Sequence, residues 1–252
     1  MPEHGGKIAV ALVDRGASPG AEPLLFIHGW GVSSAAFTEF FDRLAEHYRV
    51  IAPDLPGFGR SGALGQPASY HAYADFLAGI LDDLGIESAH VAGLSMGGGI
   101  ALKFAASHPR RVRSLVLMAP TGCPDVSLAA LAYNRVSEFL EQLPSPGHNH
   151  GKGRVARAFL ANLLTHPASL MATVRMVASD NLMADAAQIE APTLLLWGDR
   201  DRTIPLRLAQ EFAARLPHAT LSVMADTFHE MATTRPEDTA AIIHEFISGV
   251  RA

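Results

Sequence analysis

Short apolar runs alternate with amphipathic segments along most of the chain. The short runs have the length of buried strands, whereas residues 70–84 repeat their apolar positions at helical spacing. This alternation predicts a mostly parallel sheet with helices on both faces, an α/β architecture. Strands are predicted at 8–13, 24–27, 50–52, 89–92, 115–118, 193–197 and 220–224, and further helices around 37–44, 98–106, 206–216 and 236–250.

The alternation stops after Pro120, and residues 121–185 contain helical stripes without a convincing strand. We therefore predict a core formed by residues 1–120 and 186–252, with a helical cap inserted at 121–185. The apolar stripes either dock this cap on the core or line a site beneath it, and one face can do both. One stripe is Val136, Phe139, Leu140 and Leu143, and the other is Val155, Phe159, Leu160 and Leu163.

Composition narrows the class of protein. The 252 residues, 48% of them apolar and 18% charged, suit one large globular domain or one domain with an insertion. A net charge of −5 predicts neither nucleic acid nor an anionic membrane as a partner. The sequence shows no signal peptide and no apolar run of membrane length, which favours a cytoplasmic location. The single Cys123 predicts neither a disulfide nor a cysteine metal cluster.

The segment Gly-Leu-Ser-Met-Gly at 93–97 joins a predicted strand to a predicted helix. A serine at such a corner is held in a strained backbone conformation that exposes its hydroxyl at the carboxyl end of the sheet. Glycines two residues away on either side allow the backbone to approach closely, where a side chain would clash. Ser95 is therefore the candidate nucleophile.

A serine hydroxyl needs a base, and a histidine base needs a carboxylate that fixes its tautomer. On a parallel α/β sheet, these residues follow one another in the order serine, acid, histidine. His229, in the loop after the strand predicted at 220–224, is the candidate base. Asp201 is the preferred acid, and Asp199 and Asp125 are the alternatives.

The negative charge of a tetrahedral intermediate requires backbone N–H donors. Met96 is the first candidate donor, because it begins the helix after the serine, where the helix dipole adds positive potential. Trp30 in the loop at 28–31 is the second, although its ring also suits packing beside the pocket. We expect His28 to be a buried hydrogen-bonding residue that shapes this loop.

Two further patterns resemble ligand sites. Residues 57–62 fit G-x-G-x-x-G, but a dinucleotide fingerprint must open a helix, and here a loop-forming stretch follows, so we predict a surface turn. His148 and His150 lie in a glycine-rich segment without a nearby carboxylate, which favours an ordinary loop over a metal site. We therefore expect no cofactor and no metal.

Five segments together resemble the α/β-hydrolase superfamily, and they are distributed over nearly the whole chain outside the predicted cap. The resemblance implies a core of about eight strands with a small helical cap. It gives Ser95, Asp201 and His229 the roles of nucleophile, acid and base. It also makes Trp30 and Met96 the oxyanion donors. The segments are residues 25–31, 50–61, 93–98, 108–112 and 197–205.

One departure from the superfamily is Phe228, since members usually have glycine before the catalytic histidine. Dehalogenases and epoxide hydrolases carry an aspartate nucleophile, so Ser95 argues against both. The resemblance implies a serine hydrolase that cleaves small-molecule carboxylic esters of largely apolar character through an acyl-enzyme. Thioesterase, lactonase, perhydrolase and carbon–carbon hydrolase chemistry on the same residues, and a non-catalytic ligand receptor on the same fold, remain alternatives.

The segments at 28–31 and 54–61 also resemble the carboxylesterases that demethylate pimeloyl-carrier-protein methyl ester in biotin synthesis. Those enzymes meet an acidic carrier through a basic cap surface. Lys152, Arg154 and Arg157 lie close together in the predicted cap, although a solvated helix face is the simpler interpretation. A carrier-protein methyl ester esterase is therefore a further alternative.

Overall fold

The computed structural model describes residues 8–16, 18, 20–65, 67–123, 133–134, 137 and 151–250. In these residues a single sheet has seven strands in the order β1-β3-β2-β4-β5-β6-β7, against about eight predicted. Only β1 is antiparallel to its neighbour, and the other pairs are parallel. The strands are β1 (Leu12–Arg15), β2 (Glu22–Ile27), β3 (Tyr48–Pro53), β4 (Ala89–Leu94), β5 (Val112–Met118), β6 (Thr193–Gly198) and β7 (Ala219–Met224).

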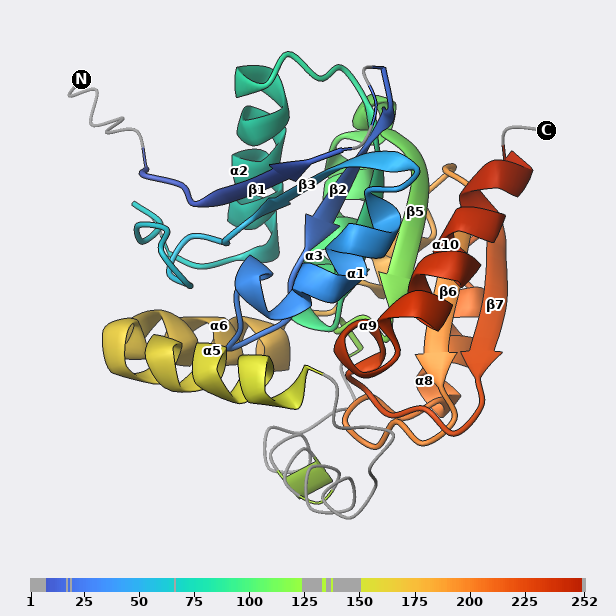
Figure 1. Cartoon of the computed structure of the whole chain (residues 1–252). Coiled ribbons are helices and arrows are strands. Elements are labelled where there is room, and N and C mark those ends of the chain that lie inside the picture. Colours follow the sequence, from blue (N-terminus) through green and yellow to red (C-terminus); the bar gives the residue numbers. More distant parts are fainter. Residues whose placement is uncertain are drawn as a thin grey trace.

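Helices cover both faces of the sheet (Figure 1). Helices α1 and α10 pack together on one face, and α2 and α3 pack together on the other. Helices α5 and α6 lie side by side near the carboxyl ends of the strands. The helices are α1 (Thr38–Leu44), α2 (Tyr70–Asp83), α3 (Met96–Ser107), α5 (Lys152–Thr165), α6 (Pro167–Ser179), α7 (Met183–Ala186), α8 (Arg207–Ala213), α9 (Met231–Thr234) and α10 (Pro236–Val250), with 3₁₀ turns η1 (Ser34–Phe37) and η2 (Pro109–Arg111).

The first strand begins later than the sequence predicted. It was expected at 8–13 but lies at Leu12–Arg15. The residues before it bond to the turn that follows β3: the carbonyl of Ala9 accepts from Gly62 N, and that of Ala11 accepts from Asp54 N. Those backbone groups therefore tie the N-terminal segment to a loop.

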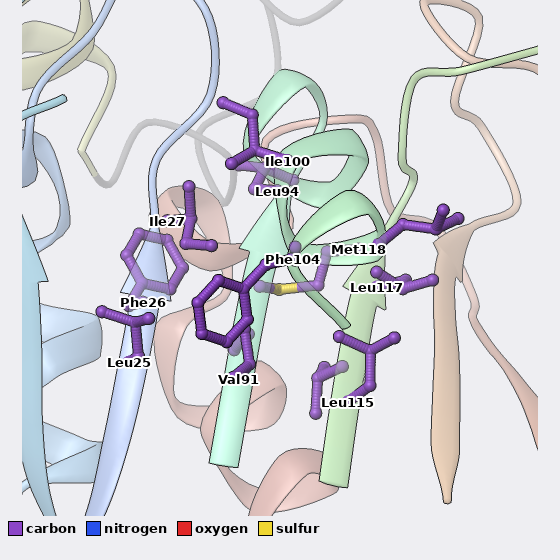
Figure 2. Packing of buried hydrophobic residues seen from close by; sticks show 14 of the residues in the cluster. Leu25, Phe26, Ile27, Val91, Leu94, Ile100, Phe104, Leu115, Leu117 and Met118 are labelled. Carbon is purple, nitrogen blue, oxygen red and sulfur yellow. The ribbon is translucent and has the colours of Figure 1, made fainter. Parts of the chain in front are cut away.

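The core forms because the central strands are apolar on both faces. All six residues of β4 are buried, as expected for a parallel strand covered by helices on each side. On one face, Phe26 packs against the aromatic rings of Phe37 and Phe41, with centroids 4.9 and 5.2 Å away. On the other, Phe104 of α3 lies against the strands that carry Val91 and Leu115 (Figure 2).

Helices α5 to α7 lie between β5 and β6, and the described residues of this stretch contain no strand. The assignment of 121–185 as a cap stays a prediction, because most of 124–150 lies outside the described residues, including the stripe at 136–143. The residues of the second predicted stripe, which lies on α5, differ in their burial. Val155 packs on the core, whereas Leu160 and Leu163 are exposed. No helix among the described residues combines the length and the apolar character needed to cross a membrane.

Candidate active site

Ser95 lies at the corner between β4 and α3. Its backbone has φ 57° and ψ −118°, a strained conformation for a residue with a side chain. Backbone bonds hold the corner: Ser95 N donates to Met118 O at 2.9 Å, and Ser95 O accepts from Gly99 N and from Thr121 N, each at 3.1 Å. Ser95 stays half-buried while the residues around it are buried, so its side chain retains access from outside.

The glycines of the corner are required by the backbone around them. A Cβ on Gly93 would lie 2.2 Å from Gly97 O, and a Cβ on Gly97 would lie 2.1 Å from Ile27 O. Both obstacles are main-chain carbonyls, which cannot rotate away as a side chain can. The start of α3 therefore packs directly against the end of β2, and this packing positions Ser95.

His229 and Asp201 form a buried pair at the carboxyl end of the sheet. The imidazole Nδ1 lies 2.7 Å from Asp201 Oδ2, and both side chains are almost fully buried. The other carboxylate oxygen, Oδ1, accepts from Ile204 N at 2.8 Å. Because a carboxylate only accepts, Nδ1 carries the proton of the neutral ring, and Nε2 is its basic nitrogen.

The structure separates the three candidate acids. Asp199 is exposed, and its Oδ1 accepts from Thr227 N at 3.1 Å in the loop that leads to His229. Asp201 is the carboxylate that contacts the imidazole. Asp125 lies outside the described residues. The sequence ranked Asp201 ahead of Asp199 but could not decide between them, because the choice depends on how the loop after β7 folds back.

Phe228 does not need the conformational freedom of glycine. Among the described residues, the non-glycine residues with positive φ are Ser95, Ala119 and Asp226, so Phe228 adopts an ordinary backbone conformation. Its ring is buried, and the Arg200 guanidinium lies 5.7 Å from the ring centroid. The departure from the superfamily pattern is therefore compatible with the position of His229.

The two candidate oxyanion donors lie on segments that meet at Ser95. Met96 is the first residue of α3. The loop that carries Trp30 passes next to the serine, since a Cβ on Gly29 would lie 3.6 Å from Ser95 Cβ. The indole of Trp30 points to the helices above, where its Nε1 donates to Thr173 Oγ1 at 3.1 Å and to Leu170 O at 3.2 Å.

His28 shapes the loop before Trp30, as the sequence predicted. It is buried, and burial lowers the pKa of its imidazole. Nε2 accepts from Leu55 N at 2.9 Å, so the Nδ1 proton donates to Gly29 O at 2.8 Å. The neutral ring thus links the loop after β2 to the loop after β3.

A cavity of about 210 Å³ opens beside Ser95. Both Ser95 and His229 border it, together with Met96 and Trp30. Most of the remaining lining is apolar, and α6 contributes Val174 and Val177. The full lining is Gly29, Trp30, Val32, Leu94, Ser95, Met96, Thr121, Val174, Val177, Thr203, Ile204, His229 and Glu230. Of the five predicted site residues, Trp30, Ser95, Met96 and His229 border this cavity, and Asp201 contacts His229 behind it.

The turn at 57–62 is more buried than predicted. Phe58 is fully buried, and Asp54 before the turn accepts from Ser34 N at 2.9 Å and from Arg60 N at 3.1 Å. A Cβ on Gly57 would lie 2.4 Å from Ser169 Oγ on α6. The turn was predicted correctly, but its surface position was wrong, because α5 and α6 lie over it.

Asn162 on α5 is a structural residue that the sequence did not reveal. It is 1% exposed. Its Oδ1 accepts from Gly59 N at 2.7 Å, and its Nδ2 donates to Gly31 O at 2.9 Å and to Val32 O at 3.1 Å. One amide thus docks α5 on two loops of the core. A lone asparagine among apolar residues was the available signal.

No group of three or more potential metal ligands occurs within the described parts of the chain. His148 and His150, which the sequence analysis weighed as a metal site, lie outside those parts.

Comparison with known proteins gives the family. Residues 22–176 match the family described as alpha/beta hydrolase fold. The chain belongs to the α/β-hydrolase fold family. The thermophilic esterase from Thermogutta terrifontis has a similar structure, with a TM-score of 0.80 and 27% identity over 97% of this chain and 95% of the esterase.

Relatives of the chain differ in named activity. It is 33% identical to the dihydrolipoyllysine-residue acetyltransferase component of the acetoin cleaving system of Cupriavidus necator, over 91% of this chain and 64% of that protein. The chain thus spans less than two thirds of that relative. It is 30% identical to the pimeloyl-[acyl-carrier protein] methyl ester esterase of Aromatoleum aromaticum, over 90% of this chain and 98% of the esterase. Lipases and carbon–carbon hydrolases are also among its relatives, so the family assignment supports a hydrolase without fixing the bond it cleaves.

Proposed function

We propose that this chain is a serine hydrolase that cleaves carboxylic esters of largely apolar small molecules through an acyl-enzyme on Ser95. The observation that carries the proposal is the shared cavity, which Ser95 and His229 both border while Asp201 holds the imidazole from behind. A nucleophile, a base and an orienting carboxylate in this arrangement are the components of acyl transfer.

In the proposed reaction His229 accepts the Ser95 proton at Nε2 as the oxygen attacks the ester carbonyl. Asp201 stays ionised and stabilises the imidazolium through the 2.7 Å contact with Nδ1. His229 then donates its proton to the leaving alcohol. In the second half of the reaction it activates water, which releases the acid and restores the serine.

The negative charge of the tetrahedral intermediates falls on the carbonyl oxygen. We assign its stabilisation to the backbone N–H groups of Met96 and Trp30. Support comes from the placement of Met96 at the N-terminus of α3, where the helix dipole favours an anion, and from the passage of the Trp30 loop beside Ser95.

The lining of the cavity supports a neutral, apolar substrate. Val32, Leu94 and Ile204 contribute apolar surface. Among the described residues that border the cavity, none is lysine or arginine, and Glu230 is acidic. A substrate group with its own carboxylate would find no cation among these residues. A neutral ester is thus favoured over a dicarboxylate cleaved at a carbon–carbon bond.

A substrate panel tests the choice of bond. Purified protein is assayed with p-nitrophenyl esters of graded acyl length, an acyl thioester, a lactone and a ring-opened dienoate of the carbon–carbon hydrolase type. We expect kcat/KM to be higher for the neutral esters than for the other members of the panel. Negligible ester turnover with good activity on another member of the panel would overturn the ester assignment.

The variant Ser95→Ala tests the nucleophile and separates an enzyme from a receptor. We expect kcat to fall by about 10⁵-fold or more, as in other serine hydrolases that lose the nucleophile. A fluorophosphonate probe should label the wild type and not the variant. Absence of labelling in both proteins, together with tight binding of a small apolar ligand, would favour a receptor over the proposed enzyme.

A further inference from the structure

Helices α5 and α6 form a hairpin whose outward face is unusually apolar. Leu160, Leu163 and Leu164 of α5 are 56%, 48% and 74% exposed, and Met171 of α6 is 57% exposed. The three leucines are spaced three and four residues apart, so they share one side of α5. Large apolar side chains gathered on one surface mark a site of interaction with another molecule or with a membrane.

This outward face is distinct from the one that docks the hairpin on the core. Asn162 of α5 and Leu170 and Thr173 of α6 are buried against the protein. Trp30 Nε1 donates to the last two of these residues, which fastens α6 to the core. Docking therefore does not require Leu160, Leu164 or Met171.

The charge of the hairpin differs from that of the whole chain. Residues 151–179 contain Lys152, Arg154, Arg157 and Arg175, and no aspartate or glutamate, whereas the chain has a net charge of −5. Arg154 forms an ion pair with Glu39 of α1 at 3.1 Å. Arg157 and Arg175 are exposed beside the apolar residues. The net charge of the chain, which argued against an anionic partner, conceals this local excess of positive charge.

We propose that the outward face of the α5–α6 hairpin binds the surface of an anionic lipid bilayer. Exposed leucines next to arginines are the composition of helices that lie in a membrane interface, with apolar side chains among the acyl chains and cations at the headgroups. A second copy of this chain suits the face poorly, because two identical cationic faces repel each other. A protein partner suits it less well than a bilayer, because leucine is under-represented among the residues that dominate protein interfaces.

The position of the hairpin gives this binding a consequence for the cavity. Val174 and Val177 of α6 line the cavity from above, while Met171 of the same helix is exposed on the outside. A helix is about 10 Å thick, so the bound bilayer would lie about one helix diameter from the cavity. Apolar esters dissolved in the bilayer would thus be concentrated near Ser95.

Vesicle sedimentation tests the proposal directly. The full chain is mixed with large vesicles of phosphatidylcholine alone or of phosphatidylcholine with phosphatidylglycerol in a 7:3 ratio. We expect binding to the anionic vesicles at low salt and at least tenfold weaker binding to the neutral ones. Raising the salt concentration should weaken the anionic interaction, because screening reduces attraction between exposed charges.

Two double variants separate the apolar and the ionic contributions. Leu160→Gln with Leu164→Gln, and Arg157→Glu with Arg175→Glu, should each weaken binding to the anionic vesicles at least tenfold. Leu221→Gln on β7 and Arg215→Glu after α8 are matched controls, since both positions are exposed and lie away from the hairpin. Ser95→Ala should bind like the wild type, so vesicle binding is tested independently of catalysis.

Three outcomes would overturn the proposal. The first is no sedimentation with anionic vesicles at low salt. The second is equal loss of binding in the control and hairpin variants, which would indicate unspecific attraction. The third is association with a purified acidic carrier protein, or with a second copy in analytical ultracentrifugation, that the hairpin variants abolish while vesicles stay unbound.

Discussion

Two glycine-rich turns lie at the same edge of the sheet, and they use glycine for different reasons. At the corner of Ser95, the space of a missing Cβ is occupied by main-chain carbonyls of the core, such as Ile27 O beside Gly97. At the turn 57–62, the space next to Gly57 is occupied by the Ser169 side chain of α6. Gly97 of the first turn is fitted to the sheet itself, whereas Gly57 of the second turn is fitted to a helix that lies over it.

The Ser95 corner belongs to the part of the fold that carries the candidate catalytic residues. The turn 57–62 belongs to the part on which the α5–α6 hairpin packs. A contact between backbones cannot be relieved by a neighbouring substitution. A contact with a side chain can be relieved by shortening that side chain. A second substitution should therefore relieve a clash introduced at the turn 57–62 but not one introduced at the Ser95 corner. Paired substitutions can measure this difference.

The largest expected effect is the loss of kcat on replacing Asp201, the candidate acid. Asp201→Asn removes the carboxylate that fixes the imidazole tautomer, and we expect kcat to fall roughly 10⁴-fold. Asp199→Asn is the matched control, because an amide oxygen can still accept from Thr227 N. It should change kcat by less than about threefold, the range of ordinary surface substitutions. A larger loss in Asp199→Asn than in Asp201→Asn would reverse the assignment of the acid.

The corner itself should tolerate no methyl group. In Gly97→Ala, the new Cβ would lie 2.1 Å from Ile27 O and 2.5 Å from His28 O. We expect a loss of about 3 kcal/mol or more in the free energy of unfolding, at the upper end of overpacking effects, measured by urea denaturation. Activity should fall with it, because α3 must shift away from β2.

A helical glycine elsewhere provides the control. Gly79 of α2 is exposed, and a Cβ there would meet nothing within 4 Å. Gly79→Ala should leave stability unchanged or raise it by up to about 1 kcal/mol, because alanine favours the helix. Similar losses at both positions would show that the backbone contact at Gly97 is not the cause.

The second turn should respond more weakly and allow rescue. Gly57 has φ 82°, so Gly57→Ala carries the strain of a left-handed residue, about 1–2 kcal/mol, together with the clash against Ser169. Adding Ser169→Gly removes the clash and should recover part of the loss. A double-mutant cycle by urea denaturation should give a coupling of at least about 0.5 kcal/mol. Strict additivity would contradict the contact.

The smallest expected effect is a pH dependence of the stability that arises in β4, the strand that leads to Ser95. His90 of β4 is buried, with Nδ1 2.8 Å from Ser114 Oγ, and burial together with the charge of Arg113 lowers its pKa to about 4. The unfolded chain takes up a proton at this residue near pH 6.5, so stability falls as the pH drops from about 6.5 to about 4. We expect a loss of about 1 kcal/mol between pH 7.5 and pH 5.5.

The matched variant for this effect is His90→Gln. Its stability should depend less on pH over the same interval, because glutamine does not titrate. β3, which leads to the turn at 57–62, contains no histidine and contributes no such dependence. Identical pH profiles for the wild type and the variant would show that His90 is not the source.

Local patterns predicted the parts of the site that depend on local contacts. Residues 93–97 were sufficient to select Ser95 as the candidate nucleophile, because the strained backbone and the glycines belong to one corner. The choice between Asp201 and Asp199 was ranked but not decided, because it depends on whether Thr227 or His229 approaches each carboxylate. Gly198 permits that approach, because a Cβ there would lie 2.1 Å from Thr227 O, which belongs to a segment distant in sequence.

Periodicity also failed to separate the two faces of α5. Val155, Phe159, Leu160 and Leu163 read as one apolar stripe, yet Val155 packs inward and Leu160 faces out. A helix that is apolar on more than one side gives no sequence signal for which side is buried. In the structure Asn162 marks the buried side of α5, because its amide finds its partners in two core loops.

The bond from the Trp30 indole to α6 supplies an optical reporter. The sequence has two tryptophans, and the other, Trp197, is fully buried in β6 with its Nε1 donating to Ile204 O at 2.8 Å. Trp30 is half-buried and touches Phe159 of α5 as well as α6. Displacement of the hairpin would change the emission of Trp30 while Trp197 served as a constant internal reference, so its movement can be followed in the unlabelled protein.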